Sequence, residues 1–452
     1  MARAWAVARV VILEIARSSG ARIFLPILFA VAWFAPRAAT RDDLVDRLRI
    51  LVSYGLGLPA FLVALAVVGW ATSSVAGEID RRTTMHLGTK PLRGYEWILG
   101  KWLGVVTIGI VLWIALVCLF AARVGVAVAR ADGAEREQAR TRFLLTRVER
   151  PVVPPPVTDA AVENAVMRQW SDRSGESRPP TASERERIET RVRRRLAVAE
   201  VAPGASAVLE FPDIDARDED TTLVLRYRLH LVPWHTVAAE VEWRAGGKSL
   251  GRGHVPQSSW GQIDVPASLV ANDGALSVEI SNREPLDSGV RILIPSGAVM
   301  VREPVRHLGL DLVLSVPLFL AQLGFLVAVA VAGAAAFSLP TANLLAYTVL
   351  LGAFSSGLLE SALSNVAPEA SGNVATGILE LLFLIASKVL VALPDLASEQ
   401  PAGRLAEGLA ITSSSIGSAV LWTLLLRGGL ALAIGAIVWT RREPAKASVE
   451  HG

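Results

Sequence analysis

The sequence has little cysteine and no excess of charge of either sign. A single cysteine, Cys118, excludes an intrachain disulfide framework and any cysteine-based zinc or iron–sulfur site. The 45 Lys and Arg residues against 42 Asp and Glu residues leave a formal net charge of +3, which favours neither a polybasic nucleic-acid binder nor an acidic tail. No nucleic acid is therefore expected among the partners.

A phosphate-binding loop of the Walker type is also missing, since that loop needs a glycine, four residues and then Gly-Lys-Ser/Thr. Residues 94–102 have five intervening residues and end in Trp102, where magnesium needs a hydroxyl. Residues 242–249 have Glu242 in place of the first glycine. We therefore expect no cofactor on this chain and no ATPase activity of its own.

Metal and nucleophile motifs are likewise incomplete. Gly247-Lys-Ser-Leu-Gly251 matches a nucleophile elbow by letter, but glycines follow where a helix should begin, so a hairpin turn is predicted. The acidic residues of 213–220 depart from calcium-loop spacing, and His230 and His235 have no carboxylate or cysteine nearby. Neither a catalytic residue nor a metal site is expected.

Apolar residues, in contrast, are abundant, at 52% of the 452 residues, with a mean hydropathy of +0.44. This is too apolar for a soluble chain of that length. The charges are segregated, because residues 131–306 hold 26 acidic and 24 basic side chains, which is 50 of the 87 charged residues. The pattern predicts a membrane protein in which one polar domain, of net charge −2, is inserted between two apolar parts.

Six apolar segments are long enough to cross a membrane as helices, which takes roughly 20 residues. They are residues 18–39, 50–77, 102–128, 308–337, 342–363 and 418–440. A seventh stretch, 378–393, carries Glu380 and Lys388 and is predicted to be a re-entrant or interfacial helix. The expected domains are thus 1–130 with three spans, 131–306 outside, 307–445 with three spans, and a cytoplasmic tail at 446–452.

The N-terminal residues form an amphipathic pattern before the first span. Trp5, Val11, Ile12 and Ile15 lie on one face of a projected helix, with Arg3 and Arg17 opposite. This is typical of a helix in the membrane interface, although a simple leader to the first span is the alternative.

Basic residues in the short loops predict the orientation of the spans. With a cytoplasmic N-terminus, the inside segments hold 12 Lys and Arg residues and the outside loops hold six. Both termini are therefore expected in the cytoplasm, as in a multi-pass protein of the bacterial cytoplasmic (inner) membrane. The 131–306 insert then lies outside the cytoplasm.

The insert changes character along its length. Residues 131–201 are charged and helix-prone, whereas from about 205 to 305 apolar residues alternate with polar ones, as in Leu223 to Leu231 and Val237 to Trp243. Further short strands are predicted at 260–265, 276–281, 290–294 and 298–302. The spacing favours a β-sandwich that resembles jelly-roll, galactose-binding-like modules.

The expected cytoplasmic loop between the second and third spans is rich in charged and polar residues. Its sequence contains Glu78, Arg81, Thr83-Thr84, Leu87, Lys90-Pro91-Leu92, Arg93, Glu96, Leu99, Gly100-Lys101 and Gly104. By residue type alone, a plain connector with a solvated face explains it as well as a docking loop does.

This order resembles the signature of type-2 ABC exporter permeases, in particular the multicopper-enzyme-maturation-like branch. The resemblance covers about 1–130 and 305–445, with Arg82-Thr83 where Gly-Thr is commoner and Arg93-Gly94 where Ser-Arg is commoner. In that family the loop forms a coupling helix that docks on a separate ATPase subunit. The resemblance implies that role for these residues: Glu78, Arg81, Arg82, Thr84, Lys90, Pro91, Arg93, Glu96 and Lys101.

Charge is unfavourable inside apolar spans, so the charged residues there, among them Arg427 and Glu360, are informative. Arg427 lies in the middle of the sixth expected span and Glu360 near the outer end of the fifth. They either pair at a dimer-facing or substrate-facing surface, or Arg427 reaches out of the hydrocarbon by itself.

The sequence thus leads to two hypotheses of function. In the first, the chain is the permease subunit of an ATP-driven exporter, paired with an ATPase and with a second permease copy or paralogue. In the second, it is a membrane-anchored extracytoplasmic binding or scaffold protein. The many spans and the 78–101 loop favour the first, because an anchor needs only one span.

Overall fold

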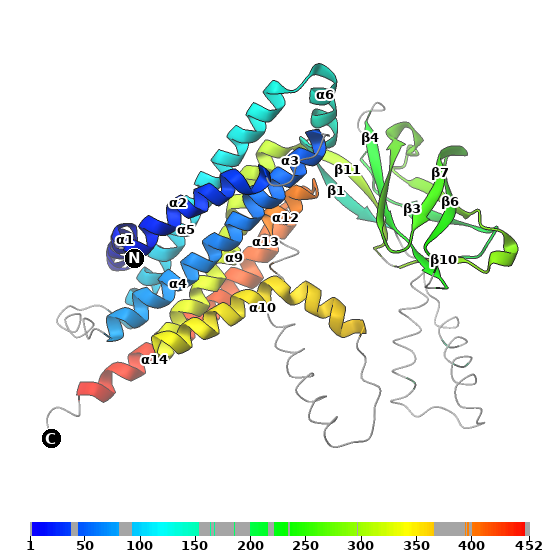
Figure 1. Ribbon diagram of the computed structural model, residues 1–452. Coiled ribbons are helices and arrows are strands. Elements are labelled where there is room, and N and C mark those ends of the chain that lie inside the picture. Colours follow the sequence, from blue (N-terminus) through cyan, green and yellow to red (C-terminus); the bar gives the residue numbers. More distant parts are fainter. Residues whose placement is uncertain are drawn as a thin grey trace. The chain divides into compact units, whose positions relative to one another are not determined.

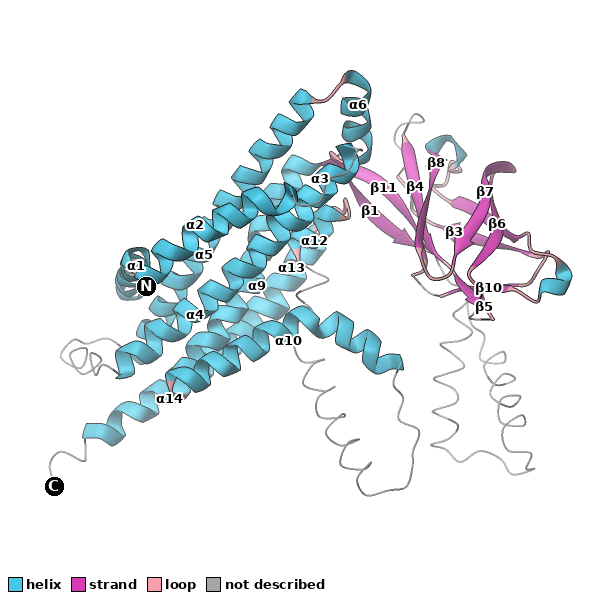
Figure 2. Cartoon of the chain, in the orientation of Figure 1, coloured by secondary structure: helices cyan, strands magenta, loops and turns pink. Residues whose placement is uncertain are grey.

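The computed structural model describes residues 2–37, 44–80, 93–152, 199–215, 221–233, 236–295, 297–365 and 400–447, together with 163, 167, 185, 394 and 396. The chain divides into two compact units, Met1–Thr146 with Arg306–Gly452, and Arg147–Val305 (Figure 1). Figure 2 shows that the first unit is helical and the second is built of strands. The helix α6 that follows the third span belongs to the first unit.

The helical unit contains these elements: α1 Ala2–Arg17, α2 Ser19–Phe34, the 3-10 turn η1 Ala35–Arg37, α3 Leu44–Val52, the π-turn η2 Ser53–Gly57, α4 Leu58–Asp80, α5 Gly94–Arg130, α6 Gly133–Arg142, α9 Leu308–Ala336, α10 Leu339–Asn365, α12 Pro401–Ala406, α13 Ser413–Ser418, the π-helix η6 Ala419–Gly428 and α14 Gly429–Ala447.

Among the residues that the structure describes, five continuous helical segments are long and apolar enough to cross a membrane. They are Ser19–Arg37, Leu44–Ile79, Gly94–Arg130, Leu308–Ala336 and Ser413–Arg441. The chain is therefore a polytopic helical membrane protein. The sequence predicted six spans, and the one expected at 342–363 falls in α10. The apolar part of α10 whose side chains are described, Leu339–Ser355, is shorter than a span requires. The re-entrant helix expected at 378–393 lies outside the described residues.

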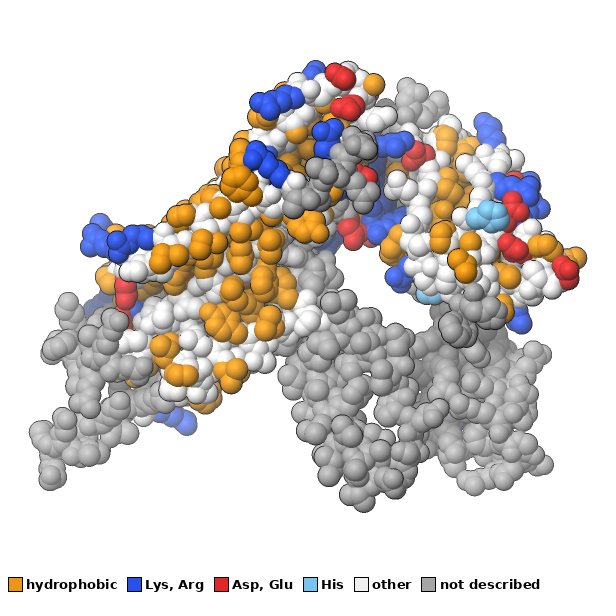
Figure 3. All heavy atoms as spheres, viewed as in Figure 1, with side chains coloured by type: hydrophobic (Ala, Val, Ile, Leu, Met, Phe, Trp, Pro, Cys, Tyr) orange, Lys and Arg blue, Asp and Glu red, His pale blue; other side chains and the backbone are white. Residues whose placement is uncertain are grey.

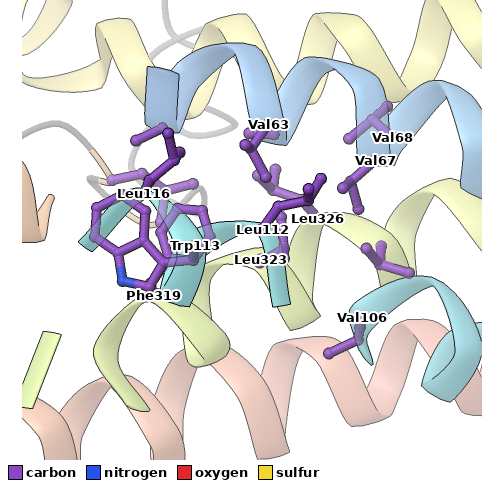
Figure 4. Packing of buried hydrophobic residues seen from close by; sticks show 14 of the residues in the cluster. Val63, Val67, Val68, Val106, Leu112, Trp113, Leu116, Phe319, Leu323 and Leu326 are labelled. Carbon is purple, nitrogen blue, oxygen red and sulfur yellow. The ribbon is translucent and has the colours of Figure 1, made fainter. Parts of the chain in front are cut away.

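The core of the helical unit forms where α4, α5 and α9 meet. Figure 4 shows valines of α4 packed against leucines of α5 and α9. The Trp113 ring is stacked on Phe319, with 4.3 Å between the ring centroids, and the Trp113 Nε1–H donates to the Ser315 hydroxyl at 3.2 Å. On the face in view, hydrophobic side chains cover the middle of the helices and charged ones gather at their ends, as a bilayer requires (Figure 3).

A buried ion pair holds the first turn of α9. The Arg306 guanidinium donates from Nε at 3.0 Å and from Nη2 at 2.8 Å to Oδ1 of Asp311, which is fully buried. The Ile411 N–H donates to the same oxygen at 2.7 Å, and the Thr146 hydroxyl donates to Oδ2. One carboxylate thus joins three segments that are far apart in the sequence.

The strand unit is built around antiparallel pairs. Its strands are β1 Leu145–Pro151, β2 Ala199–Val201, β3 Ser206–Phe211, β4 Thr222–Arg228, β5 His230–Val232, β6 Ala238–Ala245, β7 Lys248–Pro256, β8 Trp260–Pro266, β9 Leu276–Asn282, β10 Arg291–Ile294 and β11 Val299–His307. They form three sheets in the orders β1-β11-β4-β8, β2-β10-β5 and β3-β9-β6-β7. Every pair whose register is described is antiparallel, and no sheet closes into a barrel.

The alternating pattern correctly predicted the inward side chains with one exception. Leu223, Leu225, Trp243 and Ile280 are buried in one core to which strands of all three sheets contribute. Val237 is 82% exposed because β6 begins only at the next residue. The expected hairpin turn at 247 is confirmed, since Gly246 and Gly247 have positive φ between β6 and β7.

Candidate functional site

An ion pair closes the base of the loop between α4 and α5. Lys101 is 1% exposed, and its ammonium group donates to Oε1 of Glu78 near the end of α4. Its Nζ also lies 5.6 Å from the centroid of the Trp97 ring, one turn earlier on α5. The two ends of the loop are therefore held together by a charge pair in which Lys101 is buried and the Glu78 side chain is 25% exposed.

The start of α5 packs closely on the N-terminal helix α1. A Cβ added at Gly100 would lie 2.6 Å from the Val7 Cβ, and one added at Gly104 would lie 2.8 Å from the Ala8 carbonyl oxygen. Small residues face small residues at a spacing of four, because Ala4 and Ala8 are buried on α1. This lets the two helix backbones approach, as in small-xxx-small packing.

The buried side of α1 differs in part from the face expected from the sequence. Val11 and Ile15 are buried, but Trp5 is 56% exposed. The face that packs on α5 carries the small residues, since only they permit the close approach. Trp5 is left on the outer surface of the helix.

Further contacts surround the first turns of α5. The Trp97 ring is stacked on Trp439 of α14, with 4.2 Å between the centroids. The Arg93 N–H donates to the Glu96 carboxylate at 3.1 Å, which caps the helix, and Arg3 of α1 lies 3.9 Å from the same carboxylate. The Arg93 side chain points outward, and its Nη1 donates to the Tyr95 hydroxyl at 3.3 Å.

A cavity of about 430 Å³ adjoins Glu78. Its lining comes from the ends of α1, α2 and α4: Glu14, Ile15, Ser18, Trp70, Ser73, Ser74, Gly77 and Glu78. The hollow is polar and acidic, and it lies on the side of α4 that carries the ion pair. A charged group from outside the chain can reach this end of α4.

The coupling residues expected from the sequence are thus described only in part. Glu78 and Lys101 are paired, and Arg93 and Glu96 share the cap of α5. The other five, Arg81, Arg82, Thr84, Lys90 and Pro91, lie outside the described residues.

The pairing of the two intramembrane charges stays a prediction. Arg427 is half-buried in η6, and no ion pair or hydrogen bond of its side chain is found within the described ranges. Glu360 falls in α10, but its side chain is outside the described part.

The sequence did not predict the contact of Arg3 with Glu96, the stacking of Trp439 on Trp97 or the close packing of α1 on α5. A sequence signal for the packing of α1 on α5 was present, because Gly100 and Gly104 form a Gly-xxx-Gly pattern opposite Ala4 and Ala8. Nothing in the sequence links Trp97 to Trp439, which lies more than 300 residues away. Comparison of the chain with known protein families, with curated proteins and with solved structures found no match.

Proposed function

We propose that this chain is the permease subunit of an ATP-driven exporter and resembles type-2 ABC permeases of the multicopper-enzyme-maturation-like branch. The observation that carries the proposal is the ion pair between the buried Lys101 and the partly exposed Glu78 at the base of the 78–101 loop. A separate ATPase that closes on nucleotide can move the spans only through a loop whose base is stiff. A connector without such a role does not need this charge pair.

The packing around the pair supports the transmission of movement from the loop to the spans. The base of the loop packs on α1 through Gly100 and Gly104, and on α14 through the Trp97–Trp439 stack. A force applied to the loop would therefore reach α4, α5 and the last span together. In this mechanism Arg93, exposed at the edge of the base, contacts the ATPase.

A second permease copy or paralogue is also part of the proposal. The segment Ser413–Arg441 is the least buried of the spans, and its exposed large apolar residues form a long surface: Leu421, Trp422, Leu425, Leu426, Leu430, Ile434 and Ile437. Arg427 lies within that surface, and an arginine near the centre of a bilayer costs about 3 kcal/mol. A partner subunit that pairs with Arg427 offsets this cost.

We further propose that both termini lie in the cytoplasm of a bacterial inner membrane, and that the insert is an extracytoplasmic β-sandwich. Two exposed positions test the orientation, one at the N-terminal cap of α5 and one on α6, which follows the C-terminal end of α5. In a Cys118→Ser background, Arg93→Cys should react with an impermeant thiol reagent only after the membrane is opened. Arg140→Cys on α6 should react in intact cells, and the reverse pattern would refute the orientation.

Purification in mild detergent tests the coupling. The tagged wild-type chain should retain an ATP-binding cassette ATPase, and Arg93→Glu should lose most of it while still inserting in the membrane. Arg140→Glu replaces another exposed arginine at the other end of the unit, is the matched control and should retain it. If no ATPase accompanies the wild type, the membrane-anchored binding or scaffold protein is the better hypothesis.

A further inference from the structure

The N-terminal helix α1 has two apolar faces, and the chain buries one of them. The residues of the buried face are Ala4, Ala8, Val11 and Ile15. On the opposite side, large apolar side chains stay exposed, since Trp5 is 56% exposed, Val10 60% and Leu13 45%. A helix that is apolar on two sides needs an apolar environment on both. A second apolar environment is therefore expected against the exposed side of α1.

Two arginines stand among these exposed apolar side chains. Arg9 lies four positions from both Trp5 and Leu13, and Arg17 lies four positions beyond Leu13, so all four residues fall on one side of the helix. Both arginines are exposed. A long basic side chain can lay its methylene groups on lipid while its charged end reaches the headgroups. Tryptophan, aliphatic and basic residues in this arrangement are typical of a helix on a membrane surface.

The contact with α5 places α1 at one boundary of the hydrocarbon. The helix packs on Gly100 and Gly104, which lie on either side of Lys101, beside the start of α5 (Figure 1). After Lys101, the 21 residues 102–122 carry no charged side chain, which is enough to cross a bilayer. The part of α1 that meets α5 therefore lies where the hydrocarbon gives way to the lipid headgroups.

The chain passes from α1 directly into a helix that lipid surrounds. Helix α2 begins at Ser19, two residues after the end of α1, and the Ala21 N–H donates to the Ser18 hydroxyl oxygen at 3.1 Å. The segment Ser19–Arg37 is apolar enough to span a membrane, and its Ile23 and Ile27 are exposed. The exposed side chains of α1 thus precede a surface that the bilayer covers.

We propose that the exposed face of α1 binds the surface of an anionic phospholipid membrane. This face consists of Trp5, Arg9, Val10, Leu13 and Arg17. Its apolar side chains enter the boundary between headgroups and acyl chains, and its two guanidinium groups bind lipid phosphates. The inference requires a bilayer alone and does not depend on the proposed transport function.

This membrane contact differs from the face expected from the sequence. Val11 and Ile15 were expected to face the membrane together with Trp5, but both are buried within the chain. Helix α1 therefore lies between the bilayer surface and the start of α5.

Fluorescence quenching in lipid nanodiscs that hold the purified full chain tests the contact. In a Cys118→Ser background, an environment-sensitive fluorophore is attached to Leu13→Cys. A nitroxide on the lipid acyl chain should quench it, and iodide in the water should not. Val208→Cys on β3, an exposed apolar position of the strand unit, is the matched control and should show the reverse.

The same experiment separates the other occupants of the face. Quenching at position 13 by iodide instead of lipid would show that the face lies in water and would overturn the proposal. Protection from both quenchers would place a protein subunit on the face and would also overturn it. The melting temperature of each labelled protein establishes that it is folded, and Trp5→Cys replaces Leu13→Cys if that variant does not fold.

A comparison of two labelled lipids tests the role of the arginines. At equal mole fraction, nitroxide-labelled phosphatidylglycerol should be preferred over nitroxide-labelled phosphatidylcholine at position 13 by about five-fold. Arg9→Gln/Arg17→Gln should bring the preference close to one, whereas Arg49→Gln, on α3 and paired with Asp46, should leave it unchanged. Equal quenching of the wild-type background by the two lipids would overturn the proposal.

Discussion

Glu78 and Lys101, 23 positions apart in the sequence, form an ion pair that joins the last turns of α4 to the early turns of α5. Lys101 is buried, while the Glu78 side chain is 25% exposed. The pair therefore stands at the edge of the packed helices, where the described part of the loop begins and ends. This makes the loop base a rigid element of the membrane unit.

Removing one member of this pair should destabilise the membrane unit. Glu78→Gln leaves the Lys101 ammonium buried without its counter-charge, and a loss of about 3 kcal/mol in unfolding free energy is expected. Thermal unfolding in detergent measures it. The exchanged pair Glu78→Lys/Lys101→Glu should recover part of the loss, and an exchanged pair no more stable than the single variant would contradict an ion pair.

A larger side chain at the point where α1 and α5 approach closely should also reduce the stability of the membrane unit. Gly104→Val places methyl groups against the Ala8 backbone and Val11, so about 1–3 kcal/mol is expected. Gly125→Val on the same helix is the control, because nothing lies within 4 Å of an added Cβ there. Protease cleavage within α1 should accelerate in Gly104→Val alone; equal cleavage in both variants would refute the packing.

The Arg306–Asp311 pair allows a direct comparison of buried and exposed charge. Asp311→Asn should lower the unfolding free energy by about 3–5 kcal/mol, since Arg306 then lacks a counter-charge in a buried site. Asp46→Asn breaks the exposed pair with Arg49 and should change it by less than about 1 kcal/mol. The difference in melting temperature between the two variants is the measurement. A similar shift in both would show that burial of Asp311 has no consequence.

Acid should weaken the strand unit through Glu242 of β6. Hydrogen bonds from Arg244 and then Arg283 hold the pKa of the Glu242 carboxyl below its ordinary value of 4.5. Because the folded-state pKa is the lower one, this stabilisation is present above the ordinary value and is lost as the pH falls through the folded-state pKa.

Unfolding experiments between about pH 6 and about pH 3 test this linkage. Glu242→Gln should be less stable than wild type at the upper pH, and the difference should shrink toward the lower one. Glu210→Gln, an exposed residue of β3, is the matched control. A stability difference between wild type and Glu242→Gln that does not change with pH would contradict the linkage.

Much of the architecture followed from local patterns. The apolar runs at 50–77, 102–128, 308–337 and 418–440 predicted spans because the bilayer selects for hydrophobicity residue by residue. The alternation at 223–231 predicted inward leucines because successive side chains of a strand point to opposite faces. The start of the third span was less visible, since α5 begins at Gly94 and includes Glu96 and Lys101, charged residues that an apolar window excludes.

The functional surfaces were predicted less completely. Glu78 and Lys101 were selected as loop residues from a resemblance, but their pairing depends on how α4 and α5 pack. A hollow lined in part by Arg37, Arg47, Arg123 and Arg130 was not predicted, because no local pattern connects these four residues.

By itself, the sequence determined that the chain enters a membrane several times and carries one polar, strand-rich insert. Hydropathy and side-chain alternation decide these features, and both act over a few neighbouring residues. Only the tertiary structure decided which charges meet: Lys101 with Glu78, Asp311 with Arg306, and four arginines around one hollow. Such partners are chosen by helix packing, which depends on the shapes of side chains far apart in the sequence.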